Sequence, residues 1–276
     1  MKFFNIGLLS LAFVFCSCDS HKVTVSFNTQ TTPSQLFYLD AYLNAFVPAD
    51  SASKSPESME TRLKVQTRSN LLMSYDDGSA RFEMKIDSVD YQSNKRSVEE
   101  YRYMEHFLGT QSFQFKMASD GTVSDPTIED SVIQFGSDDL NLIKLFLKIQ
   151  PLLPGSPVAV GETWERPVEI PGKGVKTVVY KSFKLDDLFA RDGAQLARIN
   201  MNVKYKEYPD STSDLHMESN GFIVGSGNVL FDVTHGVIMS ASLDLSGTLT
   251  VRDVVSGDTI PDMHVVQKIQ LKGELQ

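Results

Sequence analysis

The chain has 276 residues, of which 41% are hydrophobic, and its formal net charge is −9. An acidic chain is a poor partner for nucleic acid or anionic lipid headgroups, because both select basic surfaces. The 17 Phe and 9 Tyr allow a substantial core without disulfides, and both cysteines lie within the first 18 residues.

Residues 1–17 have the pattern of a removable export signal. Lys2 precedes an almost unbroken apolar run over residues 3–15, which is too short to span a bilayer. The run ends in Phe-Cys-Ser-Cys, the shape of a bacterial lipobox, in which small Cys16 and Ser17 precede the cleavage site. We therefore predict a lipoprotein signal peptide over 1–17 and a lipid, such as palmitate-bearing diglyceride, attached at Cys18. The alternative is an ordinary secretory signal with two unmodified cysteines.

Residues 18–59 are expected to carry the lipid anchor, a first strand, a short helix and a flexible linker. Val23, Val25 and Phe27 alternate with polar residues, as in a strand. Thr32-Pro33 has the pattern of a helix start, so we predict a helix over residues 33–47 that carries apolar residues at helical spacing: Leu36, Leu39, Leu43 and Phe46. The linker is PADSASKSPES, residues 48–58.

Residues 60–276 predict a β domain. The clearest strand begins at Val237, and apolar residues then alternate with polar ones to Arg252, which places one face in the core and the other in solvent. Half-solvated strands of this kind are typical of antiparallel sheets, and Gly247 predicts a bend. The fold class is therefore mainly β: a curved antiparallel sheet or half-barrel with one or two short helices. The same alternation recurs in Leu63–Thr67, Leu71–Tyr75, Phe82–Ile86, Phe113–Met117, Ala197–Val203 and Val265–Leu271.

A second helix is predicted between the two parts of this domain. Ser-Asp-Asp at 137–139 places acidic residues in a first turn, and apolar residues follow at helical spacing up to Pro151: Leu140, Ile143 and Leu147.

An internal repeat is also expected. DDGSARFEMKID (76–87) resembles RDGAQLARINMN (191–202), and each is followed 43 residues after its glycine by another turn glycine, Gly121 or Gly236. We interpret this as a duplication with halves at about 60–150 and 158–276. The alternative is that any meander of hairpins spaces its glycines in this way.

The segment PVAVGETW (157–164), after a short helix and a Leu-Pro turn, resembles an uncharacterised family of lipoproteins common in Bacteroidota. The resemblance covers about residues 60–255, and such chains look like relatives of the lipoprotein-carrier (LolA-like) superfamily. It implies a curved antiparallel sheet that wraps helices and can shelter acyl chains, and it brings no catalytic residue. The chain departs from the family in the longer lead-in at 33–47.

Six apolar side chains on the predicted strands are the candidate lining of an apolar-ligand cavity: Phe82, Met84, Ile86, Ile199, Met201 and Met239. Methionine adapts to varied apolar partners, although ordinary core filling explains the same pattern. The single tryptophan, Trp164, either closes one end of the core with its N–H on a backbone carbonyl or offers a platform to a ligand such as a sugar.

Motifs of catalysis and cofactor binding are not found. There is no G-x-S-x-G, phosphate loop or dinucleotide fingerprint, and the histidines stand without a partner at metal-ligand spacing. Residues 119–130 are rich in oxygen but lack the glycine and the terminal glutamate of a calcium loop. We therefore expect no enzyme activity, no cofactor and no metal.

Three functions remain open. The preferred one is a lipid-anchored binding module for an acyl chain or lipid. The second is an envelope scaffold that binds another protein through a patch around Tyr101, Tyr103 and Phe107, and the third is an enzyme using scattered carboxylates such as Asp138 and Asp139. No acidic run of the kind that marks surface export in Bacteroidota follows Cys18. We therefore expect the protein on the periplasmic side of the outer membrane.

Overall fold

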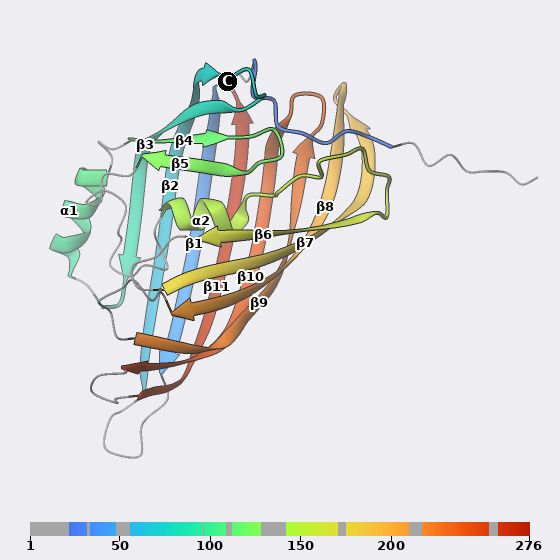
Figure 1. Cartoon of the computed structure of the whole chain (residues 1–276). Helices are drawn as coiled ribbons and strands as arrows, with labels where there is room; N and C mark the ends of the chain where they lie inside the picture. Colours follow the sequence, from blue (N-terminus) through green and yellow to red (C-terminus); the bar gives the residue numbers. More distant parts are fainter. Residues whose placement is uncertain are drawn as a thin grey trace, which may run out of the picture.

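A computed structural model describes residues 22–31, 34–47, 56–95, 97–108, 112–127, 142–170, 175–209, 217–253 and 259–276. We label its strands and helices as in Figure 1. The elements in chain order are β1 (Gln35–Val47), β2 (Glu57–Ser74), β3 (Ala80–Ser93), α1 (Val98–Leu108), β4 (Ser112–Met117), β5 (Val123–Thr127), α2 (Leu142–Ile149), β6 (Thr163–Ile170), β7 (Val175–Arg191), β8 (Ala194–Pro209), β9 (Met217–Asp232), β10 (Val237–Asp253) and β11 (Thr259–Leu275).

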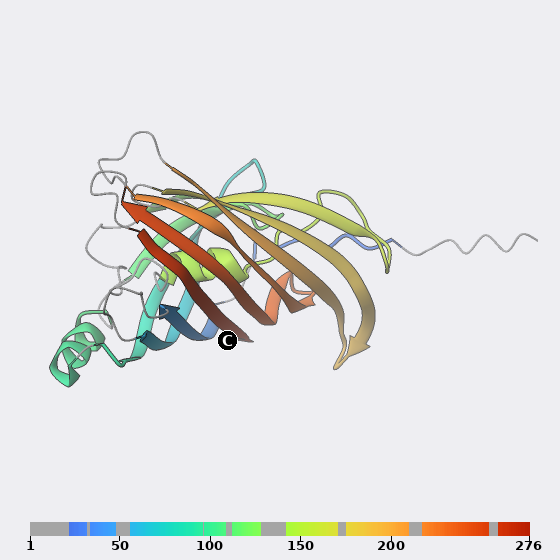
Figure 2. The same ribbon diagram turned by 90° about the horizontal axis from the view of Figure 1, so that it is seen from below.

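The eleven strands of the described residues form one sheet in the order β5-β4-β3-β2-β1-β11-β10-β9-β8-β7-β6, and its paired neighbours are antiparallel. The prediction of a mainly β, curved antiparallel sheet is confirmed. The sheet bends strongly (Figures 1 and 2), but β5 and β6 remain unpaired edges. The first and last strands, β1 and β11, pair with each other in its middle.

The two faces of the sheet differ in composition. Opposite residues in a ladder share a face, so the register of β1 defines both. Phe37, Leu39, Ala41, Leu43 and Ala45 are buried on what we call the inner face, whereas the residues between them lie on the outer face and are more exposed. The core is therefore built on the inner side of the curve, where α2 also lies.

The predicted helix over residues 33–47 is wrong, because most of this segment is strand β1. Leu36, Leu39 and Leu43 do have helical spacing, but Leu39 and Leu43 also belong to the period-two series of the inner face. As a strand, the segment forms backbone ladders with β2 on one side and β11 on the other. A short isolated helix would lack these pairings, and its intrinsic stability in water is marginal. Tertiary pairing therefore decides the conformation.

The predicted first strand at Val23–Phe27 is also not a member of the sheet. Its one bridge joins Val23 to Val158. Residues 22–31, which we call the N-terminal segment, instead cross the hairpin tips at one end of the sheet. The Phe27 and Asn28 backbone N–H groups donate to the carbonyls of Ser119 (2.7 Å) and Gly236 (3.1 Å), and the Thr29 hydroxyl donates to the Gly78 carbonyl (2.6 Å).

The second predicted helix is confirmed as α2, although it begins at Leu142 and residues 137–141 lie outside the described part. Helix α1 was not predicted. A capping box starts it: the Ser97 N–H donates to the Glu100 carboxylate (2.8 Å), and the Glu100 N–H donates to the Ser97 hydroxyl (3.4 Å).

The four glycines used to infer the repeat all lie at turns with positive φ: Gly78, Gly121, Gly193 and Gly236. The hairpin tips are thus confirmed, and the duplication itself stays a prediction. A different requirement acts at Gly227 inside β9, where a Cβ atom would lie 2.0 Å from the carbonyl oxygen of Ser242 in β10. This close approach of two backbones has no space for a side chain.

We predict that Gly227→Ala lowers the free energy of unfolding by about 1–3 kcal/mol, because the new methyl group forces β9 and β10 apart. Ser226→Ala, which changes the neighbouring exposed position of the same strand, is the control and should stay within about 0.5 kcal/mol of wild type. Urea titration followed by circular dichroism measures both. Equal stabilities of the two variants would contradict the close approach.

Candidate functional site

The two unpaired edges of the sheet come together over α2. A cleft of about 310 Å³ lies there, lined by Val123 of β5, Ile143 and Leu147 of α2, and Val168 of β6. We call it the seam cleft. It is mostly apolar, and its volume is at the lower end of the range of small-molecule sites. Because no ladder joins β5 to β6 among the described residues, opening the seam between these two strands breaks no ladder hydrogen bond.

Helix α2 fills the interior beside the cleft. Six of its eight residues are buried, including Leu145 and Ile149, which are fully inaccessible. Phe146 lies 5.9 Å from Phe115 and 6.1 Å from Phe37 between ring centroids, so one aromatic side chain joins α2 to both β4 and β1. The helix therefore acts as the core filling of the curved sheet.

Lys181 of β7 closes the C-terminal end of α2. Its ammonium nitrogen donates to the carbonyls of Leu147 and Gln150, each at 2.7 Å, which satisfies two acceptors that a helix end leaves open. Burial lowers the pKa of Lys181 to about 7, because the charged form loses its hydration. A neutral amine still has two N–H donors for the same two carbonyls.

A second buried lysine, Lys148 of α2, faces β11 and β8. It donates to the Gln267 side-chain oxygen (3.0 Å) and lies 5.4 Å from the centre of the Tyr205 ring. The interior thus contains polar groups at one level of the inner face. Beyond this polar level, toward the end of the sheet where Val47 lies, the inner face is apolar again. Its residues there include Ile223 and Met263, which are only partly buried.

Five of the six predicted lining residues lie on the inner face of the sheet. They come from two strands on opposite arms of the sheet. Phe82, Met84 and Ile86 are in β3, and Ile199 and Met201 are in β8. All five are at most 3% exposed and belong to the packed core. In this structure they are therefore covered by their neighbours, and the seam cleft is lined by other residues. The role of the five predicted residues in ligand binding stays a prediction.

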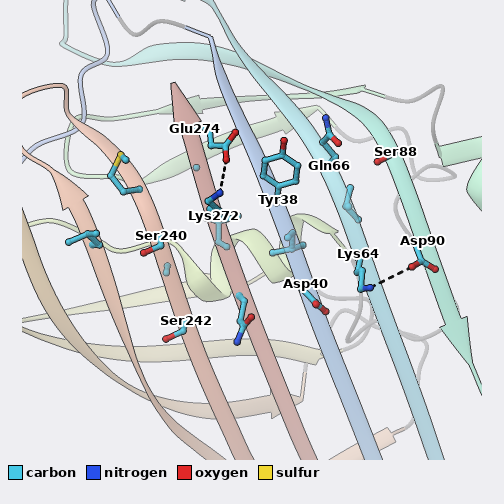
Figure 3. Close-up of a pocket in the computed structure, with 18 of the residues that line it drawn as sticks. Tyr38, Asp40, Lys64, Gln66, Ser88, Asp90, Ser240, Ser242, Lys272 and Glu274 are labelled. Atoms are coloured by element: carbon cyan, nitrogen blue, oxygen red, sulfur yellow. Dashed lines mark hydrogen bonds and ion pairs between the residues drawn. The ribbon is translucent and has the colours of Figure 1, made fainter. Parts of the chain in front are cut away.

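Met239, the sixth, lies elsewhere. The register of β10 shifts between Ile238 and Ser240, so Met239 is the extra residue of a β-bulge. It lines a hollow of about 1120 Å³ on the outer face, which we call the outer hollow (Figure 3). The uninterrupted alternation assumed from the sequence placed Met239 on the inner face.

Trp164 has the first of the two roles considered from the sequence, a contact of its N–H with a backbone carbonyl. Its indole N–H donates to the Leu152 carbonyl at 2.7 Å, and its ring stacks on Phe183 with 5.5 Å between centroids. It thereby fixes edge strand β6 to the segment that follows α2.

Two residues of the predicted interaction patch on α1 have described side chains, and the patch itself stays a prediction. Tyr101 packs against Tyr91 and hydrogen-bonds the backbone of Ser93, whereas Tyr103 is 72% exposed. The Phe107 side chain, Cys18, Asp138 and Asp139 lie outside what the structure describes. Among the described residues, no cluster of His, Cys, Asp and Glu could hold a metal, and no helix is long and apolar enough to cross a membrane.

The two interior lysines were missed by the sequence reasoning, although Lys181 has a recognisable signal. In β7, Val179, Lys181, Phe183 and Leu185 form one period-two series, so the lysine occupies an apolar phase. A cation at such a position must find internal acceptors or lose its proton. The seam cleft had no local signal, because it joins residues from three separated segments.

Comparisons with known proteins identify a solved structure of similar fold but no family. No family model and no curated protein matches the chain. A solved structure titled "Lipid-protein interactions in lipovitellin" is similar over 89% of this chain and 25% of that one, with 12% identity and a TM-score of 0.51. This chain therefore spans about a quarter of the lipovitellin chain, and the likeness concerns the fold alone.

Two further solved structures are much less similar. They are DynF of the dynemicin pathway of Micromonospora chersina (9% identity, 99% of this chain and 94% of that one, TM-score 0.22) and a mutant porin of Rh. blastica (9% identity, 87% and 100%, TM-score 0.24). With TM-scores this low, these two likenesses do not indicate a shared fold.

We predict that Lys181 makes stability depend on pH. Because its pKa is about 7 in the folded state and the ordinary lysine value is 10.5, the unfolded chain binds more protons between these two pH values. The free energy of unfolding of wild type should therefore rise relative to Lys181→Met from pH 7 to pH 10, by at most about 1.4 kcal/mol for each pH unit. Denaturant titrations at several pH values measure this difference.

Lys184→Met is the control, because it removes a half-exposed lysine from the same strand. This variant should keep the wild-type slope. A constant difference between wild type and Lys181→Met over the whole range would show that Lys181 keeps an ordinary pKa.

Proposed function

We propose that this protein is a lipid-anchored envelope lipoprotein that binds an apolar ligand, such as an acyl chain or lipid, on the inner side of its curved sheet. The observation that carries the proposal is the seam cleft, where Leu147, Leu152 and Val168 present apolar surface between two edges that no ladder joins in the described part of the sheet. The role is binding rather than catalysis.

The construction of the interior supports this function. A closed sheet would give a ligand no lateral entrance, whereas here β6 can move relative to β5 without loss of a ladder. In the described part of the chain, a short helix rather than a second sheet packs into the interior on this side. The fold resembles that of lipovitellin, whose solved structure is titled for lipid–protein interactions.

The cellular part of the proposal rests on the sequence. The lipobox predicts a lipid on Cys18, and an anchor with two or three acyl chains is effectively permanent. The family resemblance of PVAVGETW and the absence of an acidic run after Cys18 support the periplasmic side of the outer membrane as the location.

A different role, as a scaffold that binds another envelope protein, is favoured by one observation. Phe46, Phe222, Val224 and Val266 are 39–58% exposed on adjacent rows of the outer face of β1, β9 and β11. Exposed apolar groups gathered on one surface are typical of interaction sites. In-cell crosslinking at Phe222 that returns one envelope protein would support this role.

We predict that Val168→Trp weakens binding of an acyl ligand by about tenfold, or about 1.4 kcal/mol, because the indole fills the seam cleft. Displacement of the fluorescent fatty acid cis-parinaric acid, together with native mass spectrometry of the purified protein, measures the affinity. Val266→Trp makes the same substitution at an exposed outer position and should bind as wild type. Binding that is equal in all three proteins, or missing in wild type, would refute a ligand site at the seam.

We predict that Cys18→Ser abolishes acylation and releases the protein from the membrane fraction. Mass spectrometry of the amino terminus and fractionation of cells measure these two effects, and Cys16→Ser is the control that should remain acylated. A Cys18→Ser protein that still sediments with envelopes would contradict the anchor without affecting the ligand site.

A further inference from the structure

The outer hollow is a second site, on the face opposite to the seam cleft and the core. It extends over six strands from β3 to β9, five interstrand steps or about 24 Å. Its residues lie in two rows. Ser88, Gln66, Tyr38, Lys272 and Ser240 oppose one another across the strands of the first row.

The second row lies two residues along each strand and is polar throughout. Its members are Asp90, Lys64, Asp40, Gln270, Ser242 and Asn228. Figure 3 shows both rows, with Tyr38 between Gln66 and Lys272 and with Asp40 in the row beside it.

The charges of the outer hollow are compensated locally. Lys272 pairs with Glu274 at 2.6 Å, and Lys64 lies 3.9 Å from Asp90. Asp40 accepts two hydrogen bonds from Arg62, at 2.6 and 3.0 Å. Each charge therefore has an opposite neighbour, so the hollow selects neither anions nor cations by net charge.

The neutral polar side chains of the hollow differ from its charged groups in their hydrogen bonding. Among the described residues, the structure records no hydrogen bond from the side chains of Gln66, Gln270 and Asn228, or from those of Ser88, Ser240 and Ser242. Amides and hydroxyls both donate and accept, so this array can bind a ligand with several hydroxyl groups.

Tyr38 adds an apolar contact at the centre of this array. It is 38% exposed although it lies on central strand β1, and the bulge brings Met239 to the same hollow. An exposed aromatic ring offers a flat apolar face, and its hydroxyl remains a polar end. The pyranose ring of a sugar is complementary to this combination, because its C–H groups form an apolar face and its hydroxyls form a polar rim.

We propose that the outer hollow binds an uncharged oligosaccharide, with Tyr38 stacked on one sugar ring and the side chains of Gln66, Gln270 and Asn228 bonded to hydroxyl groups. The length of the hollow fits a chain of several sugars rather than one. This site is independent of the apolar ligand, because it lies on the other face of the sheet and shares no residue with the seam cleft.

The experiment uses maltohexaose, cellohexaose, chitohexaose and mannohexaose as probes, with binding measured by saturation-transfer NMR and calorimetry on the protein without its lipid anchor. We expect at least one hexaose to bind, with an affinity that changes little between low and high salt, because the charges of the site are already paired. Tyr38→Ala should weaken binding by about tenfold, the size of one aromatic contact. Gln66→Leu, which keeps the size of the side chain, should also weaken it.

Tyr180→Ala is the matched control, because Tyr180 is an exposed tyrosine of the outer face on β7, outside the hollow. It should bind as wild type. Retention on gels that contain amylose or another polymer of the bound sugar identifies a site for chain interiors, and binding of the free hexaose alone identifies a site for short oligosaccharides.

Three results would overturn the proposal. They are the absence of binding by all four hexaoses, equal affinity of the Tyr38→Ala and Tyr180→Ala variants, and an affinity for the bound hexaose that disappears at high salt. The thermal unfolding of each variant is measured alongside, so that a loss of binding is not assigned to loss of the fold.

Discussion

The apolar inner face of one open sheet is the constraint on which the rest of the structure depends. Eleven strands expose more apolar surface on this face than a sheet without a covering layer can leave in water. Curvature folds the two arms toward each other, and α2 occupies the space between them. The same solution leaves β5 and β6 unpaired, so the requirement for burial also creates the seam cleft.

The bonding of the polar side chains follows from this division of the sheet into two faces. On the inner side, Lys181 and Lys148 are surrounded by protein and bind carbonyl or amide oxygens, because a buried donor without an acceptor is costly. On the outer side, ion pairs such as Lys272 with Glu274 are exposed and contribute little to stability. Polar side chains there remain available for water or a ligand.

The sequence predicted parts of β2, β3, β4, β8, β10 and β11, because alternation is a local signal of a half-buried strand. It failed at β1, where Leu39 and Leu43 fit both periods and only pairing with β2 and β11 decides between them. It also failed at Met239, because no local pattern in residues 237–241 indicates a bulge. Cavities were the least predictable feature: the seam cleft joins β5, α2 and β6, and the outer hollow depends on register over six strands.

The N-terminal segment restricts how the molecule can face a bilayer. Four residues separate Cys18 from Val23, whose backbone is hydrogen-bonded to that of Val158, and the five residue steps between them reach at most about 18 Å. If Cys18 carries the lipid, Val23 must stay within that distance of the headgroups, and the hairpin tips are contacted four to six residues further along the segment. Gly121 belongs both to these tips and to the seam cleft. An acyl chain leaving the membrane would then meet the cleft at the end of the protein where the anchor is attached.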